Sequence, residues 1–111
     1  KGSIINITDT YLSKGVANYS IYSAAKAGLE AITKGLAREL APEIKVNAIA
    51  PGAMLEPPDV TWTEEQKNKV IDSIPLKRMG SEKDIAEAVK FLADSEYITG
   101  QIIKVDGGRS L

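Results

Sequence analysis

The sequence predicts an α/β fold in which parallel strands alternate with helices. Short apolar runs rich in β-branched residues recur at 4–7, 44–50 and 101–105, and residues with helical periodicity lie between them. A strand followed by a helix and a second strand is the βαβ unit of a parallel sheet. No repeat, low-complexity tract or linker interrupts this order, so the chain is interpreted as one piece of one domain.

The first predicted strand contains Ile4, Ile5 and Ile7. A short apolar segment rich in β-branched residues is typical of a strand that is covered on both faces. Such a strand would place Asp9, which follows it directly, at the carboxyl edge of the sheet.

A long helix is predicted from about residue 18 to residue 40. Apolar side chains follow one another at helical spacing there, at Leu29, Ile32, Leu36 and Leu40, and Pro42 stops the helix. The first half of the helix is lined with small residues, namely Ala24, Ala25, Ala27 and Gly28. Small residues let another backbone come close, and the sequence leaves open whether that backbone belongs to the same subunit or to a second one.

The second predicted strand, at 44–50, ends at Pro51-Gly52. The segment 53–75 that follows is rich in proline and contains one short predicted helix, at 64–71. A long excursion after a parallel strand is where open α/β sheets bind ligands, so this segment is interpreted as a lid or substrate loop. An ordinary crossover loop is the alternative.

The next helix begins at Ser81, which forms a capping-box pattern with Asp84. Its apolar residues continue at helical spacing, so we expect this helix to pack on the core and assign it no chemistry. The third predicted strand, at 101–105, is closed by Asp106-Gly107-Gly108.

The composition excludes several classes of function. Fourteen basic and fifteen acidic residues give a net charge of −1, so nothing marks the chain as a partner of nucleic acid or of a membrane surface. The sequence has no Cys and no His, which excludes disulfides, thiolate and Ser/His chemistry and most transition-metal sites, and no metal is predicted. Without a long apolar run or a signal-peptide pattern, a cytoplasmic protein is expected.

Tyr22 and Lys26 are the first candidates for chemistry. They lie four positions apart, so on a helix the phenol and the ammonium share one face. A phenol has an ordinary pKa of about 10, and a nearby ammonium favours the phenolate, which would make a general acid–base near neutral pH. The same spacing also occurs on helices with no catalytic role.

Four ordered motifs give this pair a context. They are Asn6-Ile7-Thr8-Asp9, the Tyr22/Lys26 pair, the Val-Asn-Ala-Ile-Ala-Pro-Gly run at 46–52, and Ile98-Thr99-Gly100 leading to Val-Asp-Gly-Gly at 105–108. In this order and spacing they resemble the C-terminal half of the short-chain dehydrogenase/reductase family.

This resemblance implies the C-terminal part of a doubly wound, Rossmann-like parallel sheet. Residues 1–111 would form the catalytic and substrate half of a single domain, without the N-terminal dinucleotide-binding half. The chain opens on Lys1 and runs at once into a strand, so we expect it to be the C-terminal part of a longer protein. The family commonly forms homodimers and homotetramers, which makes a homo-oligomer the expected assembly.

The resemblance also implies roles for individual residues. Tyr22 would be the acid or base that acts on the substrate, and Lys26 would lower the pKa of Tyr22 and hold the nicotinamide ribose. Asn47, within the family's V-N-x-x-x-P-G pattern, is interpreted as structural. The implied cofactor-binding residues are Thr8, Tyr22, Lys26, Pro51, Gly52 and Met54.

Asp9 departs from most of the family, which has Ser at this position. An Asp thirteen residues before the catalytic Tyr resembles the pteridine reductases, which reduce pterins and folates with NADPH, and Tyr19 matches a further Tyr of that branch. Asp9, Tyr19 and Tyr22 are then the expected substrate contacts. A carboxyl group accepts from ring donors of a pterin, whereas it repels a ketone oxygen. The alternative is that Asp9 only caps a turn.

The predicted function is therefore an NADPH-dependent pterin reductase in which Asp9, Tyr22 and Lys26 are catalytic. A general carbonyl reductase or dehydrogenase is one alternative. An enoyl reductase is another, because Tyr19 and Lys26 are seven apart, the spacing found in divergent enoyl reductases. Glu56 stands where many members have a cofactor-binding Thr, which puts that contact in doubt. A non-catalytic fragment is the alternative of another class, since no Gly-rich phosphate-binding turn is present.

Overall fold

A computed structural model of the chain describes residues 1–10, 20–54 and 61–111. Each strand and helix that the sequence predicts is present, and the long helix is described from Ser20 onward. In chain order the elements are β1 (Gly2–Ile7), α1 (Ser20–Leu40), β2 (Ile44–Pro51), α2 (Glu64–Asp72), α3 (Glu82–Asp94) and β3 (Ile102–Val105).

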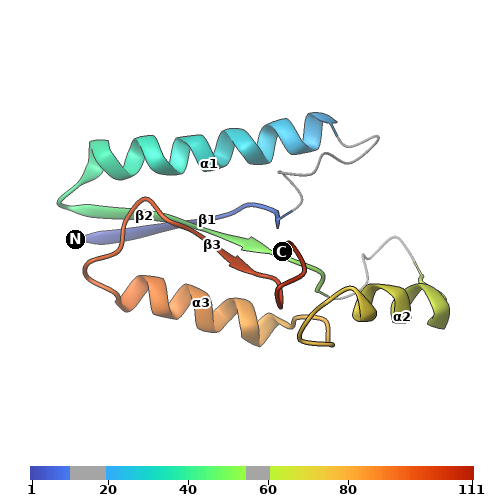
Figure 1. Cartoon of the computed structure of the whole chain (residues 1–111). Helices are drawn as coiled ribbons and strands as arrows, with labels where there is room; N and C mark the ends of the chain where they lie inside the picture. The colour runs from blue at the N-terminus through green and yellow to red at the C-terminus, as the bar shows by residue number, and fades with distance from the viewer. Residues whose placement is uncertain (11–19, 55–60) are drawn as a thin grey trace.

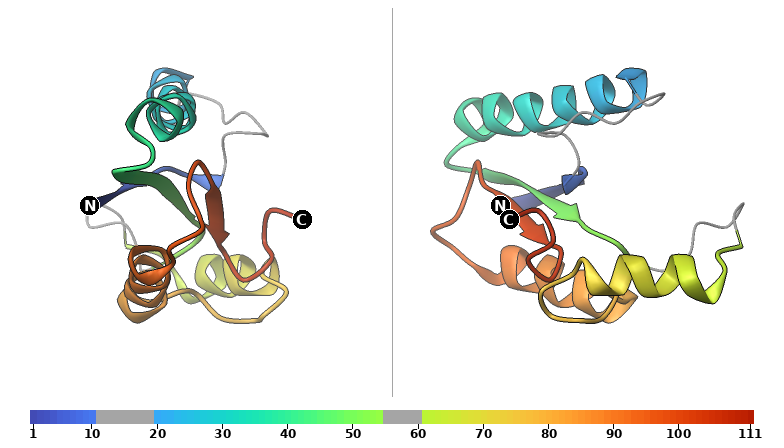
Figure 2. Two further views of the ribbon diagram at one scale, coloured as in Figure 1. Left: turned by 90° about the vertical axis from the view of Figure 1, so that its left-hand side faces the viewer. Right: turned by 45° about the vertical axis from the view of Figure 1, so that its right-hand side comes forward.

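The three strands form one parallel sheet in the order β1-β2-β3. The register pairs Ile4 with Val46 and Ala48 with Ile102. Helix α1 lies over one face of the sheet and α3 over the other, as Figure 1 and the end-on view of Figure 2 show. This is the layered, doubly wound arrangement that the alternation of strands and helices predicts.

The core is centred on β2, the middle strand. Val46, Ala48 and Ile49 have no exposed surface, because β2 has a strand on each side and a helix on each face. Ile74, which follows α2, and Leu92 of α3 are also buried. Burying an aliphatic side chain of this size stabilises the fold by about 1.5–3 kcal/mol, so most of the packing energy lies around β2.

Within this chain, β1 is not covered on both faces as predicted. Ile4 is 38% exposed and Ile7 is 42% exposed. Strand β1 is an edge strand of the described sheet, with a neighbour on one side only, so its side chains lie at the margin of both helix layers. A continuous apolar run does not distinguish a central strand from an edge strand.

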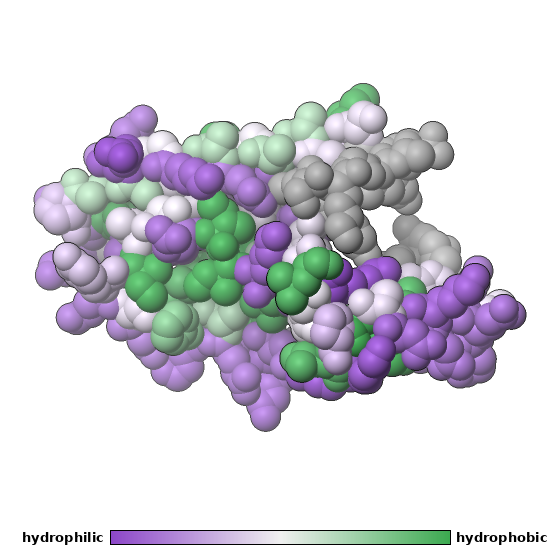
Figure 3. Space-filling view, in the orientation of Figure 1, coloured by the Kyte–Doolittle hydropathy of each residue, from purple (hydrophilic) through white to green (hydrophobic). Residues whose placement is uncertain are grey.

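Helix α1 buries only a narrow stripe, and Thr33 and Ala37 are its buried residues. Its small residues Ala24, Ala27 and Gly28 are exposed, and nothing described lies within 4 Å of a Cβ placed on Gly28. The face seen in Figure 3 has apolar residues between the two helix layers and hydrophilic residues along much of the lower helical surface. Across residues 1–10, 20–54 and 61–111, no helix combines the length and apolar character that crossing a membrane requires.

Candidate active site

The candidate site lies where β1 and β2 end. Because the two strands are parallel, their carboxyl ends meet at one edge of the sheet. Thr8 and Asp9 come directly after β1, while Pro51 and Gly52 stand at the end of β2. This edge is where open α/β sheets bind their ligands.

The structure brings Asp9, Tyr22 and Lys26 together. The Tyr22 hydroxyl donates a hydrogen bond to Asp9 Oδ2 over 3.0 Å. One turn along α1, Lys26 Nζ donates to the Ile7 carbonyl over 3.0 Å and lies 5.8 Å from the centre of the Tyr22 ring. The strand end and the first half of α1 therefore form a single cluster of a phenol, a carboxylate and an ammonium.

The net pKa shift of Tyr22 in this structure is opposite in direction to the lowering predicted from Lys26. Burial raises the pKa of Tyr22, and the hydrogen bond to Asp9 and the charge of Asp9 raise it further. The Lys26 ammonium donates to a backbone carbonyl, whereas the Asp9 carboxylate accepts a hydrogen bond from the Tyr22 hydroxyl. Tyr22 is consequently held as a protonated phenol, the form that can donate a proton.

Two buried threonines join the end of β1 to β2. Thr8 Oγ1 donates to the Ile49 carbonyl and Thr10 Oγ1 to the Pro51 carbonyl, each over 3.4 Å. The Thr8 side chain thus bonds to the neighbouring strand, and its predicted contact with a cofactor stays a prediction. Thr10, which the sequence did not single out, fixes the chain immediately beyond Asp9.

A second polar contact fixes α1 over β1. Asn6 Nδ2 donates to Thr33 Oγ1 over 2.9 Å, and Thr33 Oγ1 donates to the Leu29 carbonyl over 2.8 Å. Thr33 is fully buried, so this bond lies inside the interface between helix and sheet. It sets the position of α1 along β1, and hence of Tyr22 relative to Asp9.

The loop after β2 is held closely on the side of β3. The Gly52 N–H donates to the Val105 carbonyl over 3.0 Å, and a Cβ placed on Gly52 would lie 2.5 Å from Asp106 Cβ. Only glycine allows so close an approach. Burial alone would raise the pKa of Asp106, but hydrogen bonds from Ser110 and Gly108 outweigh it and keep the pKa below its ordinary value. Asp106 is therefore charged, is held by hydrogen bonds, and packs against Gly52 of this loop.

Met54, a predicted cofactor contact, lies against Gly80. A Cβ on Gly80 would come within 2.4 Å of Met54 Sδ, and Met54 helps to line a cavity of about 480 Å³ whose other walls include Arg78, Asp84 and Asp106. Gly80 and Arg78 were not identified from the sequence. The sequence signal nearest to these two residues is the capping-box pattern that begins at Ser81.

Asn47 is buried and fully bonded, in agreement with its structural interpretation. Asn47 Nδ2 donates to the Ile98 carbonyl over 3.1 Å, and its Oδ1 accepts from the Gln101 N–H over 3.0 Å. Two further predictions, the substrate contact of Tyr19 and the departure at Glu56, lie outside the described residues. The Tyr19–Lys26 pairing of the enoyl-reductase alternative is therefore not placed by the structure.

The donor set at this edge fits a nicotinamide cofactor. An ammonium has three N–H donors, so the bond from Lys26 to Ile7 leaves capacity for the hydroxyl oxygens of a ribose. Tyr22 adds a phenol on the same face of α1, and Pro51-Gly52 adds backbone at the adjoining strand end. Lys26, Tyr22 and this backbone are the described residues that would hold the nicotinamide end of such a cofactor.

Comparison with known proteins gives a consistent result. A family model described as enoyl-(acyl carrier protein) reductase matches residues 1–110. The chain is 44% identical to carbonyl reductase family member 4 of Danio rerio, covering 99% of this chain and 46% of that protein. It is 39% identical to dihydromonapterin reductase of an Enterobacter species, covering 99% of this chain and 45% of that one.

A solved short-chain dehydrogenase/reductase of Brucella melitensis superposes with a TM-score of 0.83 at 29% identity, over 96% of this chain and 43% of the other. The chain thus spans less than half the length of each of these proteins. Matched motifs, sheet order and superposition agree over nearly all of its residues, and the chain belongs to the short-chain dehydrogenase/reductase family.

Proposed function

We propose that the protein containing this chain is an NADPH-dependent reductase of a pterin or a related heterocycle. The observation that carries the proposal is the 3.0 Å hydrogen bond from the Tyr22 hydroxyl to the Asp9 carboxylate, beside the Lys26 ammonium. The cofactor is inferred from the family, and NADPH rather than NADH from the resemblance to pteridine reductases.

Reduction requires a hydride and a proton. Bound NADPH would supply the hydride. The protonated Tyr22 phenol supplies the proton to the substrate, and Asp9, once it has taken up a proton from solvent, can return one to Tyr22 through the bond that they share. Lys26 holds the cofactor ribose and places a positive charge 5.8 Å from the ring that would become a phenolate.

Asp9 favours a pterin over a simple ketone. A ketone offers only an acceptor, and a carboxylate facing it is repulsive, whereas a pterin presents N–H donors that a carboxylate binds. The relative named dihydromonapterin reductase, at 39% identity, supports a substrate of this class.

A carbonyl reductase is the second candidate function. It is favoured by the 44% identity to a protein named carbonyl reductase family member 4. The two candidates share Tyr22 and Lys26 and differ in what Asp9 contributes. Substrate comparison therefore separates them, whereas loss of Tyr22 does not.

Replacement of Tyr22 by Phe tests the proposed proton donor. The Phe variant loses the hydroxyl, so we expect turnover of a dihydropterin with NADPH to fall by at least about 100-fold. NADPH binding should persist, since the ring and Lys26 remain. Tyr97→Phe is the control, because Tyr97 is fully exposed. Near-normal turnover in Tyr22→Phe would remove Tyr22 from the mechanism.

A non-catalytic fragment and a homo-oligomeric state are tested separately, and a cytoplasmic location stays a prediction. Intact mass and NADPH titration of the purified protein distinguish an enzyme from a fragment: a mass equal to that of this chain alone, with no NADPH binding, would exclude the proposed function. The exposed small residues of α1 support a dimer or tetramer, which light scattering of the full-length protein measures.

A further inference from the structure

The loop that follows β2 has a second support, on the side of α3. The Gly80 N–H donates to the Ala53 carbonyl over 3.0 Å, and the Gly80 backbone lies directly against the Met54 side chain. Gly80 belongs to a turn, residues 78–81, that leads into α3. The position of Ala53 and Met54 therefore depends on what holds this turn.

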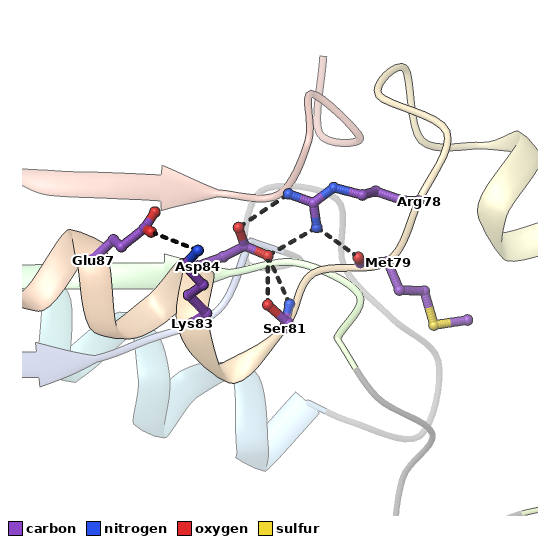
Figure 4. A network of polar contacts seen from close by, with 6 residues as sticks. All are labelled: Arg78, Met79, Ser81, Lys83, Asp84 and Glu87. Carbon is purple, nitrogen blue, oxygen red and sulfur yellow. Dashed lines mark hydrogen bonds and ion pairs between the residues drawn. The ribbon is translucent and has the colours of Figure 1, made fainter.

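Four donors converge on one carboxylate at the turn (Figure 4). Arg78 binds Asp84 in a fork, NH1 to Oδ2 over 2.9 Å and NH2 to Oδ1 over 3.0 Å. The backbone N–H and hydroxyl of Ser81 donate to the same Oδ2 over 2.8 and 3.0 Å. Arg78 NH1 also donates to the Met79 carbonyl over 3.0 Å. Both end residues of the turn, Arg78 and Ser81, are thus bonded to Asp84.

A two-bond fork fixes orientation as well as distance, which a flexible single-point ion pair does not. Hydrogen bonds from Arg78, and after them those from Ser81, hold the pKa of Asp84 well below its usual range. The carboxylate is therefore charged at neutral pH. Exposed ion pairs contribute little to the free energy of folding. The main effect expected of this pair is therefore to fix the position of the turn.

We propose that Arg78 and Asp84 are positioning residues for cofactor binding: they fix the 78–81 turn, and through Gly80 they hold the 51–54 loop against the nicotinamide end of the cofactor. The proposal rests on the proposed function, because it takes that loop as the cofactor-facing one. Neither residue is assigned a contact with the cofactor or a part in proton transfer.

Lys90 and Asp94 provide a matched control. They form an ion pair on the same helix, 2.5 Å between Lys90 Nζ and Asp94 Oδ2, four residues apart and exposed to solvent. No described contact joins this pair to the 51–54 loop. Like Arg78→Ala, Lys90→Ala removes one cation and one ion pair with a carboxylate of α3, but it leaves the turn untouched.

NADPH dissociation constants of the full-length protein, measured by fluorescence titration, test the proposal. Wild type that binds no NADPH would exclude the proposed function itself. Given wild-type binding, we expect Arg78→Ala to weaken it about tenfold, Arg78→Lys to weaken it less, and Lys90→Ala to leave it within about twofold. Equal dissociation constants for Arg78→Ala and Lys90→Ala would overturn the positioning role.

Hydrogen exchange of the protein without cofactor gives a second readout. The Gly80 amide is bonded to Ala53, so it should exchange faster in Arg78→Ala than in wild type or Lys90→Ala. Asp84→Asn keeps the shape of the side chain and loses its charge, so the Gly80 amide should exchange faster in this variant too. It replaces Arg78→Ala in the experiment if that variant does not fold. Unchanged protection of Gly80 in every folded variant would contradict the proposed linkage.

Discussion

Two groups of polar residues around the sheet differ in how completely they are bonded. Around the start of β3, Asn47 is buried and each of its polar atoms has a backbone partner. At the carboxyl ends of β1 and β2, Tyr22 is 48% exposed and its partner is another titratable side chain, Asp9. Buried amides that bond to backbone fix a fold, whereas exposed acid–base groups that bond to one another can exchange protons with a ligand.

Lys45 extends the structural group. Its ammonium donates to the carbonyls of Leu92 and Ala93 over 3.1 and 3.0 Å, and also to that of Ser95, at the end of α3. A cation at a helix C-terminus satisfies carbonyls that lack helical partners. Lys26 is likewise bonded to a carbonyl, but it lies beside a phenol at the ligand edge. The same residue type thus serves two different purposes in the two groups.

The largest effect on activity is expected from Lys26→Met. Turnover should fall by about 100-fold, because the variant loses the charge that stabilises a phenolate and the donors for the cofactor ribose. The free energy of unfolding should change little, since the ammonium makes one bond near the surface. Lys34→Met, an exposed position on the same helix, is the control, and a loss of turnover in both variants would contradict a specific role.

Asn47→Ala is expected to lower stability and to leave activity unchanged, the reverse of Lys26→Met. Two partly buried backbone groups, the Ile98 carbonyl and the Gln101 N–H, lose their partner, which should lower the free energy of unfolding by roughly 3 kcal/mol. Urea denaturation measures this against Asn68→Ala, whose side chain is exposed on α2. The kcat of the folded Asn47 variant should stay near the wild-type value; a loss of kcat without a loss of stability would place Asn47 in the site.

A smaller effect is expected for Asp84 in acid. Its folded pKa is lowered by Arg78 and Ser81, so its contribution to stability is present above the unfolded pKa, about 4, and is lost as the pH falls through the folded value. The stability difference between wild type and Asp84→Asn should therefore be full above about pH 5 and shrink below about pH 4. A difference that stays constant from pH 7 to pH 2 would show that the charge of Asp84 contributes nothing.

The smallest expected effect is a shift in the basic limb of the pH profile of kcat. Burial and Asp9 both raise the pKa of Tyr22, so the phenol stays protonated to higher pH than a free tyrosine. Asp9→Asn removes the charge but not the burial, so the pKa of Tyr22 should fall and the basic limb should move to lower pH. If the basic limb of the kcat profile does not move in Asp9→Asn, Tyr22 is not the group whose titration produces it.

Local patterns predicted much of this molecule. Apolar runs and helical spacing located every strand and helix of the described residues, and the motifs located Asp9, Tyr22 and Lys26, which the structure brings together. The exposure of β1 could not be predicted in this way. Whether a strand is central or at an edge depends on strand order, and an apolar run does not report strand order.

The direction of the Tyr22 pKa shift and the role of Arg78 also required the structure. Helical spacing placed Lys26 beside Tyr22, but it did not show that the ammonium donates to Ile7 or that the phenol donates to Asp9. The sequence indicated the Ser81–Asp84 cap. The Arg78 fork depends on how the 78–81 turn folds back, which no spacing rule describes.

The most direct test of the proposed site compares two substrates in wild type and in Asp9→Ser. The kcat/KM of the full-length protein is measured with NADPH for a dihydropterin and for a ketone. The Asp9 carboxylate binds donors and repels an acceptor, so the pterin-to-ketone ratio should be high in wild type and fall by about 100-fold or more in Asp9→Ser. A ratio that is the same in the two proteins, or a wild type that prefers the ketone, would contradict the assignment of Asp9 to a pterin.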